Sequence, residues 1–169
     1  MSETVIVNIK SGVETIILNR PDSYNAFNRE MSLAFQKAID LGASDSAVRA
    51  ILITGKGKAF SSGQDLNEAT NPKGPDLNTI LLEHFNPIIR KIRKTPKPIV
   101  IAINGIAAGA GANLALVGDI VVASESASFV QAFSKIGLIP DSGGTLPLPR
   151  LVGYAKASAW MITGEKIGA

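Results

Sequence analysis

The sequence predicts an α/β fold in which most of the strands pair in parallel. Residues 50–54 form a short, continuous apolar run, as expected for a strand that is covered on both faces of a parallel sheet, 99–103 read as the next buried strand, and 120–123 as another strand. Turns rich in glycine and other small residues follow these runs and lead into segments with helical periodicity or small side chains. Repeated strand–loop–helix order of this kind is typical of α/β proteins.

The first elements are predicted to be a hairpin and a helix. Residues 5–9 and 14–19 alternate apolar and polar side chains around the turn at Ser11-Gly12, which indicates two half-buried strands. Asn28 can cap a helix that runs to about residue 41, because apolar side chains recur there at helical spacing.

The middle of the chain is predicted to be a loop at residues 55–66, a mobile surface excursion at 67–76 and a helix at 77–93. The sequence Thr95-Pro96-Lys97-Pro98 ends that helix.

The last part is predicted to contain a helix of small residues at 109–117 and an amphipathic helix at 151–163. Residues 164–169 are expected to form a turn directly after it, an ending that indicates that further chain normally follows.

Composition excludes several classes of site. The chain has 169 residues and 46% hydrophobic residues, which fits one domain with a real core. It has no cysteine and one histidine, so thiolate nucleophiles, cysteine-based metal sites and multi-histidine sites are excluded. The net charge of +3 comes without the long basic blocks of a dedicated nucleic-acid binder.

No membrane or secretion signal is visible in the sequence. The apolar stretch 98–124 is interrupted by Asn104, Asn113 and Asp119, and the N-terminus lacks a basic start followed by an apolar block. A soluble, cytoplasmic protein is therefore expected.

Three segments combine glycine with small residues: 58–66, 104–114 and 136–145. Backbone amides at such junctions can bind an anion or a developing oxyanion, although close packing and turn geometry explain most glycine clusters. The dinucleotide-binding and P-loop patterns are absent.

Taken in order, these segments resemble the enoyl-CoA hydratase/isomerase (crotonase) superfamily over essentially the whole chain. The resemblance is carried by LNRPDSYNAFN, AFSSGQDL, NGIAAGAGANLAL, GLIPDSGGT and LPRLVGYAKASAWMITGEKI. It implies an α/β, ClpP-like spiral of repeated ββα units. It also implies that residues 1–169 form a single core domain, truncated at the C-terminus because the family's C-terminal helical region is missing.

The resemblance implies that the backbone N–H groups of Gln64 and Ala110 bind the oxygen of an acyl thioester. One such preorganised donor is typically worth about 10² to 10³ in rate. It further implies a set of residues around the substrate or its coenzyme A: Ser62, Gly63, Asp65, Leu66, Gly109 and Phe133. For Asp65, a local hydrogen-bonding role in the loop is the alternative.

The acid and base positions separate reactions within the family. The two glutamates of the family's hydratases align with Asn113 and Phe133, which cannot exchange protons near neutral pH. The remaining carboxylate is Asp141, where family isomerases and dehalogenases use aspartate. Burial near Phe133, Leu138 and Ile139 could raise its pKa and make it a carbon base. By itself, Pro-Asp-Ser-Gly-Gly is compatible with an ordinary turn.

Through its GQDL, GAGANLAL and IPDSGGT segments, the resemblance implies an isomerase that acts through an enolate, on ring-1,2-epoxyphenylacetyl-CoA in phenylacetate degradation. An enoyl-CoA double-bond isomerase or hydratase-like enzyme, and a catalytically silent CoA-binding or assembly subunit, remain alternatives. No metal or redox cofactor is expected, since coenzyme A enters with the substrate. The family implies a homotrimer or a dimer of trimers at full length, with no nucleic-acid or membrane partner.

Two further features are assigned less specific roles. His84 has no partner at a catalytic spacing and is expected on the surface. Five basic residues between positions 90 and 97 fit a solvated helix end, with attraction of coenzyme A phosphates or RNA as the alternative: Arg90, Lys91, Arg93, Lys94 and Lys97.

Overall fold

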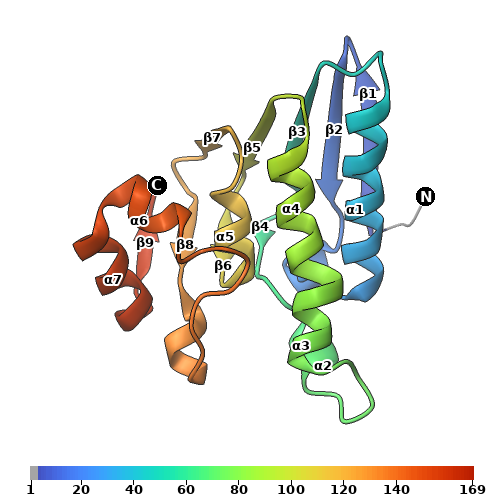
Figure 1. The fold of residues 1–169 in the computed structure, drawn as a ribbon. Coiled ribbons are helices and arrows are strands. Elements are labelled where there is room, and N and C mark those ends of the chain that lie inside the picture. The colour runs from blue at the N-terminus through green and yellow to red at the C-terminus, as the bar shows by residue number, and fades with distance from the viewer. Residues whose placement is uncertain (1–3) are drawn as a thin grey trace.

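The computed structural model describes residues 4–169, so the first residues of the N-terminal segment lie outside it. These residues form two sheets (Figure 1). The larger has the order β1-β2-β3-β5-β7: β1 (Val5–Lys10), β2 (Val13–Leu18), β3 (Ala50–Gly55), β5 (Ile99–Ile103) and β7 (Ile120–Ala123). The β1–β2 pair is the predicted hairpin and is antiparallel, and the other pairs in this sheet are parallel.

The smaller sheet is built from short strands in the order β4-β6-β8-β9: β4 (Ala59–Ser61), β6 (Ile106–Ala108), β8 (Ser128–Val130) and β9 (Lys166–Gly168). Its pairs are parallel except β8–β9. The chain passes three times from a long strand in the larger sheet to a short strand in the smaller one, as β3–β4, β5–β6 and β7–β8. Helical segments follow, so the expected ββα repetition is present.

Two helices cover one face of the larger sheet, α1 (Arg29–Ser44) and α4 (Asn86–Lys94) (Figure 1). The Asn28 side chain accepts a hydrogen bond from the Met31 N–H at 3.0 Å, which is the predicted N-cap. Helix α5 (Ala110–Ala115) is buried along its whole length and contacts β4, β5 and β6. Its small side chains allow this close packing.

The remaining helical segments are short. They are η1 (Pro21–Ser23), α2 (Leu66–Ala69), α3 (Leu77–Thr79), η2 (Ile80–Phe85), η3 (Ala132–Ile136), α6 (Pro147–Val152) and α7 (Tyr154–Thr163). Segment η2 is π-helical and continues into α4, so the helix predicted at 77–93 is one run with an irregular middle.

Several expectations are corrected by these elements. Segments predicted as loops contain β4, β6 and α2, because three or four residues are too few for a periodic signal. The helix predicted at 151–163 is two helices, since Gly153 adopts φ +84° between them. The predicted terminal turn contains β9, which is stabilised by antiparallel pairing with β8.

The core lies between the larger sheet and its helices and includes a group of three aromatic rings. Phe27 packs edge-on against Phe35 at 5.7 Å between ring centroids and lies 5.8 Å from Phe85. All three side chains are buried, and they join α1 and η2 to the segment before α1. None of the helices formed by residues 4–169 has the length and apolar character needed to cross a membrane.

Candidate active site

The first of the glycine-rich segments carries the Gln64 amide just after β4. Phe27 N–H donates to the Gly63 carbonyl at 2.7 Å, and Asp65 N–H donates to the Phe27 carbonyl at 2.9 Å. Gln64 lies between these two hydrogen bonds as the partner of Phe27 in a parallel bridge. Because donors alternate in direction along an extended chain, the Gln64 N–H points away from Phe27. It meets no acceptor among residues 4–169.

The second amide belongs to Ala110, the first residue of α5. Gly109 N–H donates to the Val130 carbonyl at 2.9 Å, which ties the loop before the helix to β8. The Ala110 N–H has no acceptor within its helix and none elsewhere in the described chain. Gly63 lies directly beside it: a Cβ at Gly63 would be 3.1 Å from the Ala110 nitrogen. Two unpaired N–H donors therefore lie on adjoining segments.

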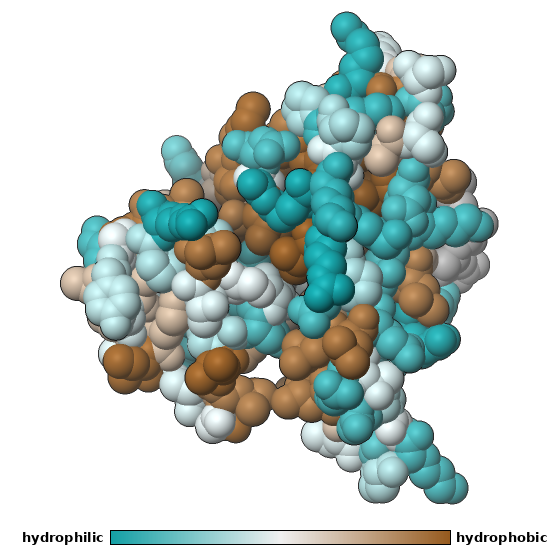
Figure 2. All heavy atoms as spheres, in the orientation of Figure 1, coloured by the Kyte–Doolittle hydropathy of each residue, from teal (hydrophilic) through white to brown (hydrophobic). Residues whose placement is uncertain are grey.

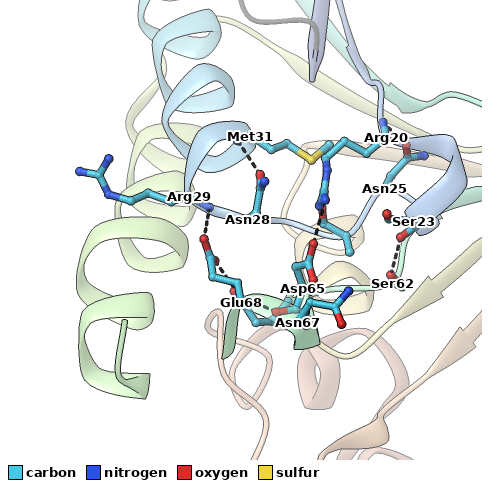
Figure 3. Close-up of polar contacts among 12 residues, drawn as sticks. Arg20, Ser23, Asn25, Asn28, Arg29, Met31, Ser62, Asp65, Asn67 and Glu68 are labelled. Atoms are coloured by element: carbon cyan, nitrogen blue, oxygen red, sulfur yellow. Dashed lines mark hydrogen bonds and ion pairs between the residues drawn. The ribbon is translucent and has the colours of Figure 1, made fainter. Parts of the chain in front are cut away.

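Polar contacts hold the Gln64 segment in place (Figure 3). Asp65 forms an ion pair with Arg20 at 2.8 Å and caps α2 by accepting from the Asn67 N–H at 3.0 Å. Glu68 accepts from the Arg29 N–H at 2.9 Å and from the Gln64 side-chain amide at 3.0 Å. Asp65 thus has the local hydrogen-bonding role named as the alternative, and no sequence pattern indicates its partner Arg20, which lies 45 residues away.

Asp141 lies in the third glycine-rich segment, after η3. Burial raises the pKa of its carboxyl above the ordinary value, while the Ser142 hydroxyl, which donates to Asp141 Oδ1 at 2.9 Å, acts in the opposite direction. The direction agrees with the expectation from the sequence. One expected contributor is wrong, because Ile139 is 80% exposed and its side chain is not part of the apolar surroundings.

A cavity of about 550 Å³ brings the predicted residues together. Its walls include Ser62, Gln64, Asp65, Leu66, Gly109, Ala110, Phe133 and Asp141, whereas Gly63 is not part of the wall. The other wall residues are apolar where they come from α3, η2 and η3, and include polar side chains where they come from η1 and α2. In Figure 2, hydrophobic atoms gather on both sides of an opening at the lower edge, between the α2–α3 region and the segment containing η3. An apolar ligand with one polar, oxyanion-forming group suits this cavity.

Asn113 and Phe133, which align with the two glutamates of the family's hydratases, lie in different surroundings. Phe133 lines the cavity with its ring. Asn113 is fully buried in α5, and its side-chain nitrogen donates to the Asp141 backbone carbonyl at 2.9 Å. Asp141 therefore lines the same cavity as Ala110, and the Asn113 side chain connects its loop to α5.

The expected surface position of His84 is wrong, because its side chain is completely buried in η2. Burial lowers its pKa, and its Nδ1 lies 4.0 Å from the Glu68 carboxylate. Both ring nitrogens lack a hydrogen-bond partner within the described residues. The sequence signal failed because a histidine between leucine, glutamate and phenylalanine fits either face of an irregular helix.

The basic run at the end of α4 is partly occupied by structural contacts. Lys91 pairs with Asp40 at 2.6 Å, Arg93 lies 3.8 Å from Asp119, and Lys97 donates to the carbonyls of Gly42 and Asp45 at 2.6 Å. Lys91, Arg93 and Lys97 thus contact other parts of the protein, so the expected solvated helix end describes this run only in part. Among residues 4–169, no group of three or more potential metal ligands comes together.

Comparison with known proteins identifies a family and several relatives that this chain is similar to. The sequence profile of the enoyl-CoA hydratase/isomerase family matches residues 8–169. The chain is 46% identical to the 1,2-epoxyphenylacetyl-CoA isomerase of Escherichia coli (strain K12), a match that covers 100% of this chain and 66% of the relative. It is 38% identical to the trans-2-decenoyl-[acyl-carrier-protein] isomerase of Streptococcus mutans, covering 98% and 64% respectively.

A solved structure of a protein from the same family also matches this chain. The crystal structure of an enoyl-CoA hydratase/isomerase family protein from Mycobacterium abscessus superposes with a TM-score of 0.92 at 38% identity. The match covers 98% of this chain and 65% of the other. The chain thus spans slightly less than two thirds of the length of these relatives.

Proposed function

Because the chain belongs to the enoyl-CoA hydratase/isomerase family, we propose that it is an acyl-CoA isomerase that acts through an oxyanion-stabilised enolate. The observation that carries the proposal is a single cavity, which is lined by Gln64, Ala110 and Asp141. The proposed substrate is ring-1,2-epoxyphenylacetyl-CoA. The 46% identity to an isomerase of that substrate supports the choice, as does the apolar wall of the cavity.

The proposed chemistry follows from where charge develops. Asp141 removes a proton from the carbon beside the thioester carbonyl, and the electron pair left on carbon is shared with the carbonyl oxygen. The N–H groups of Gln64 and Ala110 stabilise that oxygen, because each of them has no other acceptor in the described chain. The electron pair can then break a carbon–oxygen bond of the epoxide, whose oxygen takes up the proton held by Asp141, or that proton can return at another carbon. No atom is gained or lost in either route, so each is an isomerisation.

Hydration is disfavoured for a specific reason. Adding water to a double bond needs one group to activate the water and another to protonate carbon. Asn113 donates its amide to a backbone carbonyl, and Phe133 has no titratable group. With Asp141 alone, one proton can be moved, which suits isomerisation.

A panel of acyl-CoA thioesters tests this function. We expect turnover of ring-1,2-epoxyphenylacetyl-CoA, slower double-bond shift in a medium-chain enoyl-CoA, and hydration of crotonyl-CoA at least about 10²-fold slower than isomerisation. Chromatography and mass spectrometry distinguish the products, because hydration adds the mass of water and isomerisation does not. Binding of these thioesters without any conversion would instead identify a silent CoA-binding subunit.

A further inference from the structure

The loop that carries Asp141 is tied to α5 by two buried side-chain amides that the proposed reaction does not use directly. Asn113, in α5, donates through Nδ2 to the Asp141 backbone carbonyl at 2.9 Å. Gln131 in turn donates through Nε2 to Asn113 Oδ1 at 2.8 Å. Both side chains are buried, so these hydrogen bonds are protected from competition with water.

The order of these contacts determines which way the Asn113 amide faces. A side-chain amide has an acceptor oxygen at one end and a donor nitrogen at the other. Since the Gln131 donor engages the oxygen, the Asn113 nitrogen is directed at Asp141. Gly144 N–H donates to the same Asp141 carbonyl at 2.8 Å. A Cβ on Gly144 would overlap the Asn113 amide, so the loop packs directly on that side chain.

The same short helix therefore contacts both parts of the proposed site. Ala110, which offers an oxyanion donor, is the first residue of α5, and Asn113 follows three residues later. We propose that Asn113 and Gln131 are positioning residues that hold the Asp141 base at a fixed place relative to the Ala110 amide. This inference rests on the isomerase function proposed above. Asn113, which cannot itself act as an acid or a base, would in this way contribute by positioning the base.

Steady-state exchange of the α-protons of phenylacetyl-CoA with D₂O tests the inference. Because a displacement of about 1 Å can cost on the order of 10²-fold in rate, we expect Asn113→Leu and Gln131→Met to lower kcat by about 10- to 100-fold. KM should stay within about twofold, since neither residue is expected to touch the thioester. If Gln131 acts through Asn113, the double variant will be no slower than Asn113→Leu.

The matched control is Gln36→Met. Gln36 also donates its side-chain amide to backbone carbonyls, those of Glu83 at 2.8 Å and His84 at 3.3 Å, but it lies outside the cavity wall. It should keep the kcat of the unaltered chain. An unchanged kcat in Gln131→Met and Asn113→Leu would overturn the inference, and so would losses that multiply in the double variant. Should Asn113→Leu fail to fold, Gln131→Met against the control decides the matter.

A second measurement separates this inference from the proposed function. Amide hydrogen exchange, followed by mass spectrometry, should become faster at residues 141–144 in Gln131→Met and Asn113→Leu, and should not change there in Gln36→Met. If the unaltered chain exchanges no α-protons, the proposed function fails. Unchanged protection at 141–144 in Gln131→Met and Asn113→Leu would overturn the positioning role, whatever the activity.

Discussion

Asp141 is partly shielded from water and lines the same cavity as Gln64 and Ala110, as the proposed role of a carbon base requires. Burial raises the pKa of its carboxyl, which makes the carboxylate a stronger base, and the Ser142 hydroxyl opposes this by donating a hydrogen bond to it. The balance between these two effects sets the pH at which the base becomes ionised.

The pH profile of α-proton exchange should reflect this balance. The active form of the base is ionised, so the rate should rise with pH through an apparent pKa above the ordinary aspartate value of 3.8. In Ser142→Ala the hydrogen bond that stabilises the carboxylate is lost, and the midpoint should move to higher pH. Rate measurements from pH 4 to 9 check both statements. A midpoint that stays in place or moves down would contradict them.

Glu14 is a second carboxyl group with a raised pKa, and it lies far from the cavity in β2. Burial raises its pKa to about 7, although the Lys97 ammonium acts in the opposite direction. Its side chain is 1% exposed and lies against Gly42 of α1. The folded protein thus binds this proton more tightly than the unfolded chain.

The stability of the protein should depend on this proton. The stabilisation from the proton bound by Glu14 is complete below about pH 4.5, the ordinary pKa of a glutamate, and is lost as the pH rises through about 7. The free energy of unfolding of Glu14→Gln should therefore match that of the unaltered chain near pH 5 and exceed it by about 1–3 kcal/mol near pH 8. Urea unfolding at both pH values measures the difference. If the two proteins differed in stability by the same amount at both pH values, the raised pKa of Glu14 would be contradicted.

At single positions, sequence and structure agree where a residue belongs to a short contiguous motif. Gln64 and Ala110 each follow a glycine directly, Asp141 precedes Ser142-Gly143-Gly144, and all three line one cavity. Gln131 and Arg20 act through partners far along the chain, which no local pattern reveals. The sequence predicts a surface position for His84, which is wrong because the π-helical segment breaks the regular helical spacing.

The packing of the β4–Gln64 segment against the start of α5 depends on a glycine. Gly63 adopts φ +89°, and a Cβ there would lie 2.9 Å from the Ala108 carbonyl oxygen. A side chain at this place would push the two amide-bearing segments apart.

Gly63→Ala should accordingly affect both stability and chemistry. We expect a loss of about 1–3 kcal/mol in the free energy of unfolding. We also expect a fall of about 10²-fold in α-proton exchange, the typical effect of losing one oxyanion donor. Urea unfolding and the exchange assay measure the two effects. Ser62→Ala, which changes a neighbouring side chain but leaves the glycine in place, is the comparison for the unfolding measurement. An exchange rate for Gly63→Ala equal to that of the unaltered chain would show that the spacing of the segments is not critical.

The long strands could be predicted and the short ones could not, for a physical reason. β3 and β5 are continuous apolar runs rich in isoleucine, which is the signature of a buried strand in a parallel sheet, and β7 is a similar apolar run although its side chains are exposed. β4, β6 and β8 have three residues each and are stabilised by pairing with one another across long stretches of chain. The same tertiary pairing explains β9.

On the scale of the whole molecule, the larger sheet ends at an uncovered edge. β7 is the last strand in its order, and the side chains of Ile120, Val121 and Val122 are all exposed. An exposed apolar edge strand can pair with a second chain. The described residues should therefore associate as concentration rises, and Val122→Lys should reduce this association by placing a charge on the edge. Sedimentation velocity from about 5 to 200 μM measures it, with Lys58→Ala, away from this edge, as the comparison. Concentration-independent sedimentation of the unaltered chain would contradict the expectation.

The most direct test of the central claim compares the unaltered chain with Asp141→Asn in D₂O. Deuterium should enter the α-carbon of phenylacetyl-CoA in the presence of the unaltered chain. In Asp141→Asn the rate should fall by at least about 10²-fold, because a positioned base contributes about 10² to 10⁴. The dissociation constant for the thioester should remain within about twofold. An Asp141→Asn protein that exchanges deuterium as fast as the unaltered chain would show that another group moves the proton.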